Sequence, residues 1–137
     1  MRRVIIALTV GGEEHSTVNS DHVLDQLRES GAILHVFSVE RSALRSTMVA
    51  SNPKDLLQEN MHLHRVLGDG PNQSGGRHQS IVASTGILMP LQNLASELAN
   101  QYRVSYTLPP AAKRAERLNI SVKRRGLVVR APSKLPR

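Results

Sequence analysis

The chain contains no cysteine, and only three of its 137 residues are aromatic: Phe37, Tyr102 and Tyr106. The lack of cysteine excludes disulfides, thiolate nucleophiles and cysteine-based zinc or iron–sulfur sites. So few aromatic rings argue against a base-stacking nucleic-acid platform and against an aromatic sugar-binding cleft. No apolar run approaches the roughly 20 residues that span a bilayer, and residues 4–8 are too short a run for the apolar region of a signal peptide. With 39% hydrophobic residues, the composition predicts a soluble α/β domain with no signal peptide in this chain, and it leaves the localisation open.

The net charge of +7 comes from the end of the chain. Residues 101–137 carry 10 of the 18 lysines and arginines and a single acid, Glu116. Such a segment either forms a basic solvent face on edge strands, which discourages edge-to-edge association, or attracts phosphate backbones and anionic surfaces. In the second case residues 103–130 would bind a polyanion such as nucleic acid. The candidate contacts are Lys113, Arg114, Arg117, Lys123, Arg124 and Arg125.

The pattern of the first 40 residues predicts a strand, a helix and a second strand. Residues 3–9 and 32–39 are continuous apolar runs, which are typical of parallel strands buried on both faces. Between them, Ser20 is an expected N-cap, residues 21–30 an amphipathic helix and Gly31 its C-cap. Short βαβ units of this kind place their two strands side by side and parallel.

Residues 53–131 predict two further helices, a loop and several short strands. We expect a helix over residues 53–66 and, because of its glycines and proline, a loop over 68–76. Residues 81–83 suit either a short strand or a loop, and residues 88–101 predict a helix whose inward face carries Leu91, Leu94, Leu98 and Tyr102. Alternation then predicts three short antiparallel strands, at residues 103–108, 118–123 and 127–131.

Few residues carry a specific chemical signal. His35 lies in a predicted buried strand, where a hydrogen-bonded core histidine is expected, and His62 and His64 point to different faces of a helix. No phosphate-binding loop and no Gly-x-Ser-x-Gly motif is present. One loop has suggestive geometry because it follows the carboxyl end of the first strand, the edge at which open α/β sheets bind ligands. Its candidate partner-binding residues are Thr9, Glu13, Glu14, His15 and Ser16.

The order of these segments resembles the second half of a von Willebrand factor type A (VWFA) domain. The first strand ends in Leu-Thr before a glycine turn with acids, and the strand at residues 33–39 follows a helix. Downstream, Ser74-Gly-Gly-Arg77 is similar to a Thr-Gly-Gly-Arg/Lys turn, and residues 94–106 resemble the closing helix and strand of a bacterial subgroup described from acidobacteria. The basic strand pair at 118–131 completes a resemblance that covers residues 2–131.

The resemblance implies a Rossmann-like parallel sheet, truncated at the front, and a degenerate metal site. VWFA domains bind a divalent ion through an Asp-x-Ser-x-Ser loop, a threonine and an aspartate. This chain has no Asp-x-Ser-x-Ser sequence, and Val10 stands where the aspartate is expected. Magnesium needs about six oxygen ligands in near-ideal octahedral geometry, whereas Glu13 and Glu14 are adjacent and diverge. We therefore expect no bound magnesium and no other cofactor.

These observations together predict a non-enzymatic protein-interaction or adhesion-type module. Residues 1–108 form a partial VWFA-like domain, 109–131 a basic strand pair and 132–137 a frayed tail. The alternatives are a polyanion-binding protein and a hydrolase built on Glu13 and Glu14. A sheet that lacks its front strands leaves an apolar edge unpaired, which predicts self-association.

Overall fold

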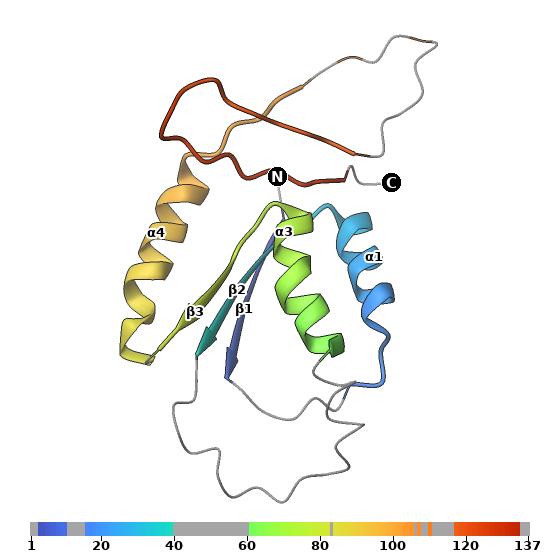
Figure 1. The fold of residues 1–137 in the computed structure, drawn as a ribbon, viewed down its shortest axis with the longest axis vertical. Helices are drawn as coiled ribbons and strands as arrows, with labels where there is room; N and C mark the ends of the chain where they lie inside the picture. Colours follow the sequence, from blue (N-terminus) through green and yellow to red (C-terminus); the bar gives the residue numbers. More distant parts are fainter. Residues whose placement is uncertain are drawn as a thin grey trace, which may run out of the picture.

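The computed structural model describes residues 3–10, 16–39, 61–82, 84–105, 107, 110 and 117–134. Its centre is a parallel sheet of three strands in the order β1-β2-β3, which confirms the predicted α/β fold with a parallel βαβ core (Figure 1). The strands are β1 (Val4–Val10), β2 (Ile33–Val39) and β3 (His78–Ile81). The register places Val4 beside Ile33 and Val36 beside His78, so all three carboxyl ends lie at the same edge of the sheet.

Helix α1 (Ser20–Ser30) joins β1 to β2 as predicted, and Gly31 ends it in the left-handed conformation at φ 63°. The predicted N-cap was wrong by one residue. Asn19 caps the helix, because its Oδ1 accepts from the backbone N–H of Asp21 at 2.8 Å. Ser20 is instead the first helical residue, and its side chain is buried.

The predicted loop at residues 68–76 was wrong, because the chain is helical there. Residues 61–64 are α-helical, η1 (Arg65–Asp69) is a π-helical stretch, and α3 (Gly70–Ser74) continues to a left-handed C-cap at Gly75, where φ is 86°. Residues 53–60 of the predicted helix lie outside the described residues.

Close packing explains why glycine and proline occupy a helix here. A Cβ on Gly70 would lie 3.2 Å from Leu34 Cδ2 and 3.3 Å from Leu24 Cδ2, so the missing side chain lets α3 approach both β2 and α1. Pro71 is the second residue of α3 and directly follows the π-helical stretch η1. Tertiary contact therefore overrides the loop-forming composition.

Helix α4 (Leu88–Ala99) follows the 3-10 helix η2 (Ser84–Ile87) and covers the opposite face of the sheet. In Figure 1, α4 lies next to β3, whereas α1 and α3 lie together on the other side. The core on the α4 face consists of Phe37, Ile81 and Leu94, with Val39, Ile87, Leu91 and Leu98 packed around them. The predicted inward leucines are thus confirmed, but Tyr102 lies beyond the helix and is 93% exposed.

Burial of the two long strands differs, contrary to the prediction that both are covered on both faces. Strand β2 is buried over residues 33–37, which confirms the expectation for that strand. Strand β1 lies at the edge of the sheet, and its aliphatic side chains are exposed, with values of 47% for Ile6 and 58% for Leu8. The cause is the placement of α4, whose core contacts come from β2 and β3.

The described C-terminal residues form a loop closed at its base, and the strands predicted at 118–123 and 127–131 are absent there. Arg117 and Lys134 make one antiparallel bridge, and the Leu118 N–H donates to the Ser133 carbonyl at 2.9 Å. The Ser133 N–H donates to the Gln73 carbonyl at 3.0 Å, which joins the loop to the end of α3. Residues 117–134 are called the basic loop below.

Candidate functional site

Three side chains from three strands form a hydrogen-bonded row on the α1 and α3 face of the sheet. The hydroxyl groups of Thr9 and Ser38 lie 2.9 Å apart, and the Ser38 hydroxyl lies 2.8 Å from His78 Nε2. The register explains the row, because Thr9 pairs with Ser38 and His78 pairs with Val36, so all three side chains project to the same face. The row crosses β1 and β2 one residue before their carboxyl ends and meets β3 at its first residue, His78.

The row places a serine hydroxyl beside a histidine imidazole. A serine beside a histidine is the starting pair for nucleophilic catalysis, which also needs a group that orients the imidazole and donors for an oxyanion. Among the described residues, no carboxylate hydrogen-bonds His78, and the Ser38 hydroxyl is shared with Thr9. The row sets two hydroxyl groups and one imidazole side by side on the sheet.

The predicted partner-binding loop is described only at its two ends. Thr9 belongs to the hydrogen-bonded row, and the Ser16 hydroxyl accepts from the Val18 N–H at 3.2 Å. Glu13, Glu14 and His15 lie outside the described residues. At the described part of this edge, Thr9 contacts the hydroxyl of Ser38 and Val10 is aliphatic. No group of three or more histidines, aspartates or glutamates gathers within the described ranges.

A cavity of ≈ 460 Å³ opens beside the first turn of α1. The Ser20 hydroxyl in its wall lies 2.9 Å from His62 Nδ1, and an exposed ion pair joins Arg65 to Asp21 at 2.7 Å. These contacts tie α1 to the helical residues 61–69. The cavity is lined by Ser16, Thr17, Val18, Asn19, Ser20, Val23, His62, Leu63, Val66 and Leu67.

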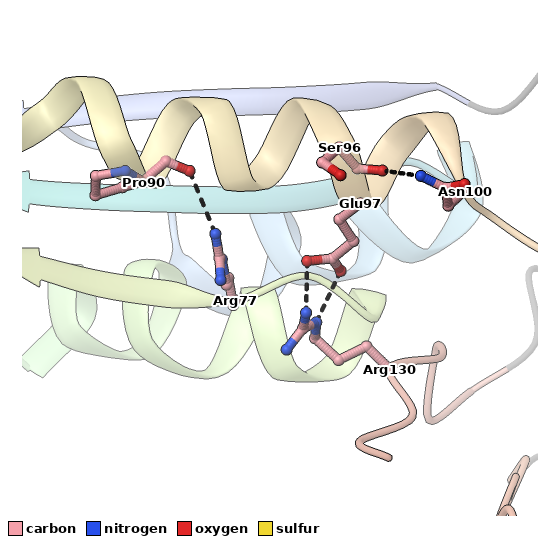
Figure 2. Close-up of polar contacts among 6 residues, drawn as sticks. All are labelled: Arg77, Pro90, Ser96, Glu97, Asn100 and Arg130. Atoms are coloured by element: carbon pink, nitrogen blue, oxygen red, sulfur yellow. Dashed lines mark hydrogen bonds and ion pairs between the residues drawn. The ribbon is translucent and has the colours of Figure 1, made fainter. Parts of the chain in front are cut away.

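A second polar cluster lies on the α4 face. His35 is 1% exposed, and neither ring nitrogen has a hydrogen-bond partner among the described residues, nor does the buried Nε of Arg77. The Arg77 guanidinium donates to the Pro90 carbonyl at 3.4 Å, and Arg130 of the basic loop makes a two-point ion pair with Glu97, with Nε 2.8 Å from Oε1 (Figure 2). The prediction of a core histidine is confirmed for its burial and wrong for its hydrogen bonding.

Burial and the charges of this cluster shift the pKa values of three of its groups, His35, Glu97 and Arg130. Burial lowers the pKa of His35, Glu97 opposes that shift, and Arg77 and Arg130 add to it. The hydrogen bond from Arg130 lowers the pKa of Glu97 and outweighs the effect of burial on that carboxyl. The neutral form of His35 is therefore favoured in the folded chain, chiefly by burial.

Because the neutral form of His35 is favoured in the folded chain, acid will destabilise the protein through this residue. The unfolded chain binds a proton near the ordinary value of 6.5, whereas the folded chain binds it only at lower pH, so the free energy of unfolding falls as the pH drops below about 6.5. Replacing His35 with leucine will remove this contribution, and at neutral pH the variant will be more stable by about 1 kcal/mol, since buried unpaired polar groups cost about 1–3 kcal/mol.

Urea unfolding of the whole chain and of His35→Leu between pH 5 and pH 8 measures both effects. We expect the two stability curves to run parallel above pH 7.5 and to diverge below pH 6.5. Curves that stay parallel down to pH 5 would contradict this account of the buried histidine.

The predicted polyanion contacts are partly described. Arg117, Lys123, Arg124 and Arg125 are exposed in the basic loop, whereas residues 113 and 114 lie outside the described ranges. The sequence did not indicate Ser38, His78 or the unpartnered polar atoms of His35 and Arg77. Thr9 and Ser38 each stand one residue before the end of a strand, which was the available signal for Ser38.

Comparisons of the chain with protein-family models, with curated proteins and with solved structures found no significant match. Within the described ranges, no helix has the length and apolar character needed to cross a membrane. Functional inference therefore rests on the surfaces of the molecule itself.

Proposed function

We propose that the chain is a non-enzymatic protein-interaction module, as its resemblance to VWFA domains implies, and that it binds through the open edge of β1. The observation that supports this is the exposure of an entirely uncharged strand. Val4–Val10 contains six aliphatic residues and one threonine, and five of the aliphatic side chains are at least 36% exposed. Natural edge strands usually carry lysine, proline or a bulge that prevents pairing, and β1 has none of these protections.

The backbone geometry identifies which groups are available at this edge. The Arg3 carbonyl accepts from the Ile33 N–H at 3.0 Å, so alternate residues from Arg3 onward direct their backbone groups toward β2. The N–H and C=O groups of Val4, Ile6, Leu8 and Val10 therefore face outward. Among the described residues, no strand other than β2 pairs with β1. The edge presents four donors and four acceptors to an incoming strand.

The partner that this edge fits best is a second copy of the chain. Two β1 strands related by a twofold axis would pair antiparallel and make one continuous sheet of six strands, with the same residues contributed by each copy. The side chains of Ile6 and Leu8 lie on the α4 face, paired in register with His35 and Phe37. Pairing would bring these exposed aliphatic side chains against their counterparts and remove them from water.

Replacing Leu8 with lysine will abolish this association, because a charge at an edge strand opposes pairing and would have to be buried. Leu8 is 58% exposed, so the monomer tolerates the change. The matched control is Leu88→Lys on α4, where the leucine is 62% exposed and lies away from β1.

Sedimentation velocity over a range of concentrations tests the proposal. The unchanged chain and Leu88→Lys should form a dimer as concentration rises, and Leu8→Lys should stay monomeric. A compact monomer at every concentration of the unchanged chain would refute self-association through β1.

A second candidate is polyanion binding through residues 103–130, and the composition of the basic loop favours it. Residues 117–134 contain six lysines and arginines and no acid, and only Arg130 of these has an ion-pair partner among the described residues. Fluorescence anisotropy with duplex DNA tests this candidate. The variant Lys123→Gln/Arg124→Gln/Arg125→Gln should bind much more weakly and with a smaller salt dependence, since each phosphate contact contributes to the slope.

A further inference from the structure

The tip of the basic loop combines positive charge with exposed aliphatic side chains. Lys123, Arg124 and Arg125 form the turn, and Gly126 completes it in the left-handed conformation at φ 80°. Directly beside the turn, the exposed fractions are 49% for Val122, 56% for Leu127 and 82% for Val128. A polyanion that offers only phosphates would recognise the charges and leave these aliphatic side chains without a role.

The tip of the basic loop is exposed. Residues 121–130 are all exposed, and a Cβ on Gly126 would meet nothing within 4 Å. The base of the loop is held firmly by the Arg130 ion pair with Glu97 and by the hydrogen bond from Ser133 to Gln73. In Figure 1 the loop lies beyond the amino ends of the strands, at the opposite end of the sheet from their arrowheads.

We propose that the tip of the basic loop binds the surface of an anionic lipid bilayer, with Leu127 and Val128 entering the interface and the three basic side chains contacting lipid phosphates and carboxylates. This proposal rests on the polyanion-binding candidate and names the class of polyanion. The bilayer interface accounts for the basic and the aliphatic residues of the tip together, because basic residues are attracted by the negative surface potential and aliphatic residues are stabilised by leaving water. Duplex DNA accounts only for the basic residues, and the scarcity of aromatic rings disfavours single-stranded nucleic acid.

The expected strength of lipid binding follows from the contributions of the basic and the aliphatic residues. Each lysine or arginine near an anionic leaflet contributes about 1 kcal/mol, a factor of about five. Three such residues together contribute roughly a hundredfold in partitioning. Partial burial of the two aliphatic side chains adds roughly another tenfold.

Co-sedimentation of the full chain with vesicles of phosphatidylcholine, with and without 30% phosphatidylserine, tests the proposal, in parallel with duplex DNA binding at the same salt concentration. Two loop variants separate the contributions: Lys123→Gln/Arg124→Gln/Arg125→Gln removes charge, and Leu127→Ser/Val128→Ser removes apolar surface. The matched control, Arg65→Gln/Leu88→Ser, removes one exposed basic and one exposed aliphatic residue at the carboxyl end of the sheet.

We expect binding to the phosphatidylserine vesicles alone, about a hundredfold weaker for the charge variant, about tenfold weaker for the aliphatic variant and unchanged for the control. DNA binding should be insensitive to the aliphatic variant. Binding to DNA without binding to vesicles would overturn the lipid proposal and leave the polyanion candidate standing, whereas binding to neither would overturn both. Vesicle binding that the aliphatic variant leaves unchanged would overturn the role of Leu127 and Val128.

Discussion

Replacing Gly76 with alanine will destabilise the protein by about 3 kcal/mol or more, because the added methyl group has no space. A Cβ at this position would lie 1.9 Å from the Leu34 carbonyl oxygen and 2.7 Å from its carbon. These are backbone atoms of β2, so relief requires the chain before β3 to move away from the central strand. That movement would also strain the nearby hydrogen bond between the Val36 N–H and the Arg77 carbonyl.

Gly68→Ala is the matched control for this substitution. A Cβ on Gly68 would meet nothing within 4 Å, and alanine is favoured over glycine in a helix by about 0.5–1 kcal/mol. Chemical denaturation should therefore show one strongly destabilised variant and one that is unchanged or slightly stabilised. Equal stabilities for the two variants would contradict the close approach of residue 76 to β2.

Replacing Leu94 with alanine will cost about 2–5 kcal/mol, the usual range for a buried leucine. Leu94 is 1% exposed and packs against Phe37 and Ile81 in the core between α4 and the sheet. Leu88→Ala on the same helix should change stability by no more than about 0.5 kcal/mol, since Leu88 is 62% exposed. Thermal unfolding of the two variants measures the difference, and similar losses for both would show that α4 presents another face to the sheet.

The parallel βαβ unit was predictable because its signals are local. Two apolar runs, an amphipathic helix between them and Gly31 at the helix end lie within 40 residues, and short crossovers of this type have one dominant geometry. The N-cap was displaced by one residue because Asn19 and Ser20 are both good caps. Local sequence does not decide which of the two side chains turns back to the helix.

Tertiary contacts explain the features that were not predicted. Glycine and proline in residues 68–76 indicate a loop by composition, yet Gly70 is needed for contact with Leu34 and Leu24. A continuous apolar run likewise does not distinguish a covered strand from an edge strand, and β1 is left open by the position of α4 over β2 and β3. In both cases the deciding partner lies far away along the chain.

The candidate site also contains residues that local sequence predicts and residues that depend on long-range contacts. Thr9 was predictable from its place at the end of a strand, whereas the contacts of Ser38 with Thr9 and His78 depend on the register of three strands. The register is set by long-range pairing and is not readable from periodicity alone. The unpartnered ring of His35 also required the positions of Arg77, Glu97 and Arg130, which come from three separate segments.

Amide hydrogen exchange along β1, followed by NMR at low and high protein concentration, tests the central claim most directly. The N–H groups of Ile5 and Ala7 face β2, whereas those of Ile6 and Leu8 face the open edge. If a second copy pairs with this edge, Ile5 and Ala7 will be protected at both concentrations, and Ile6 and Leu8 will become protected only at the higher one. Rapid exchange of Ile6 and Leu8 at every concentration, beside protected Ile5 and Ala7, would contradict the assignment of β1 as the binding surface.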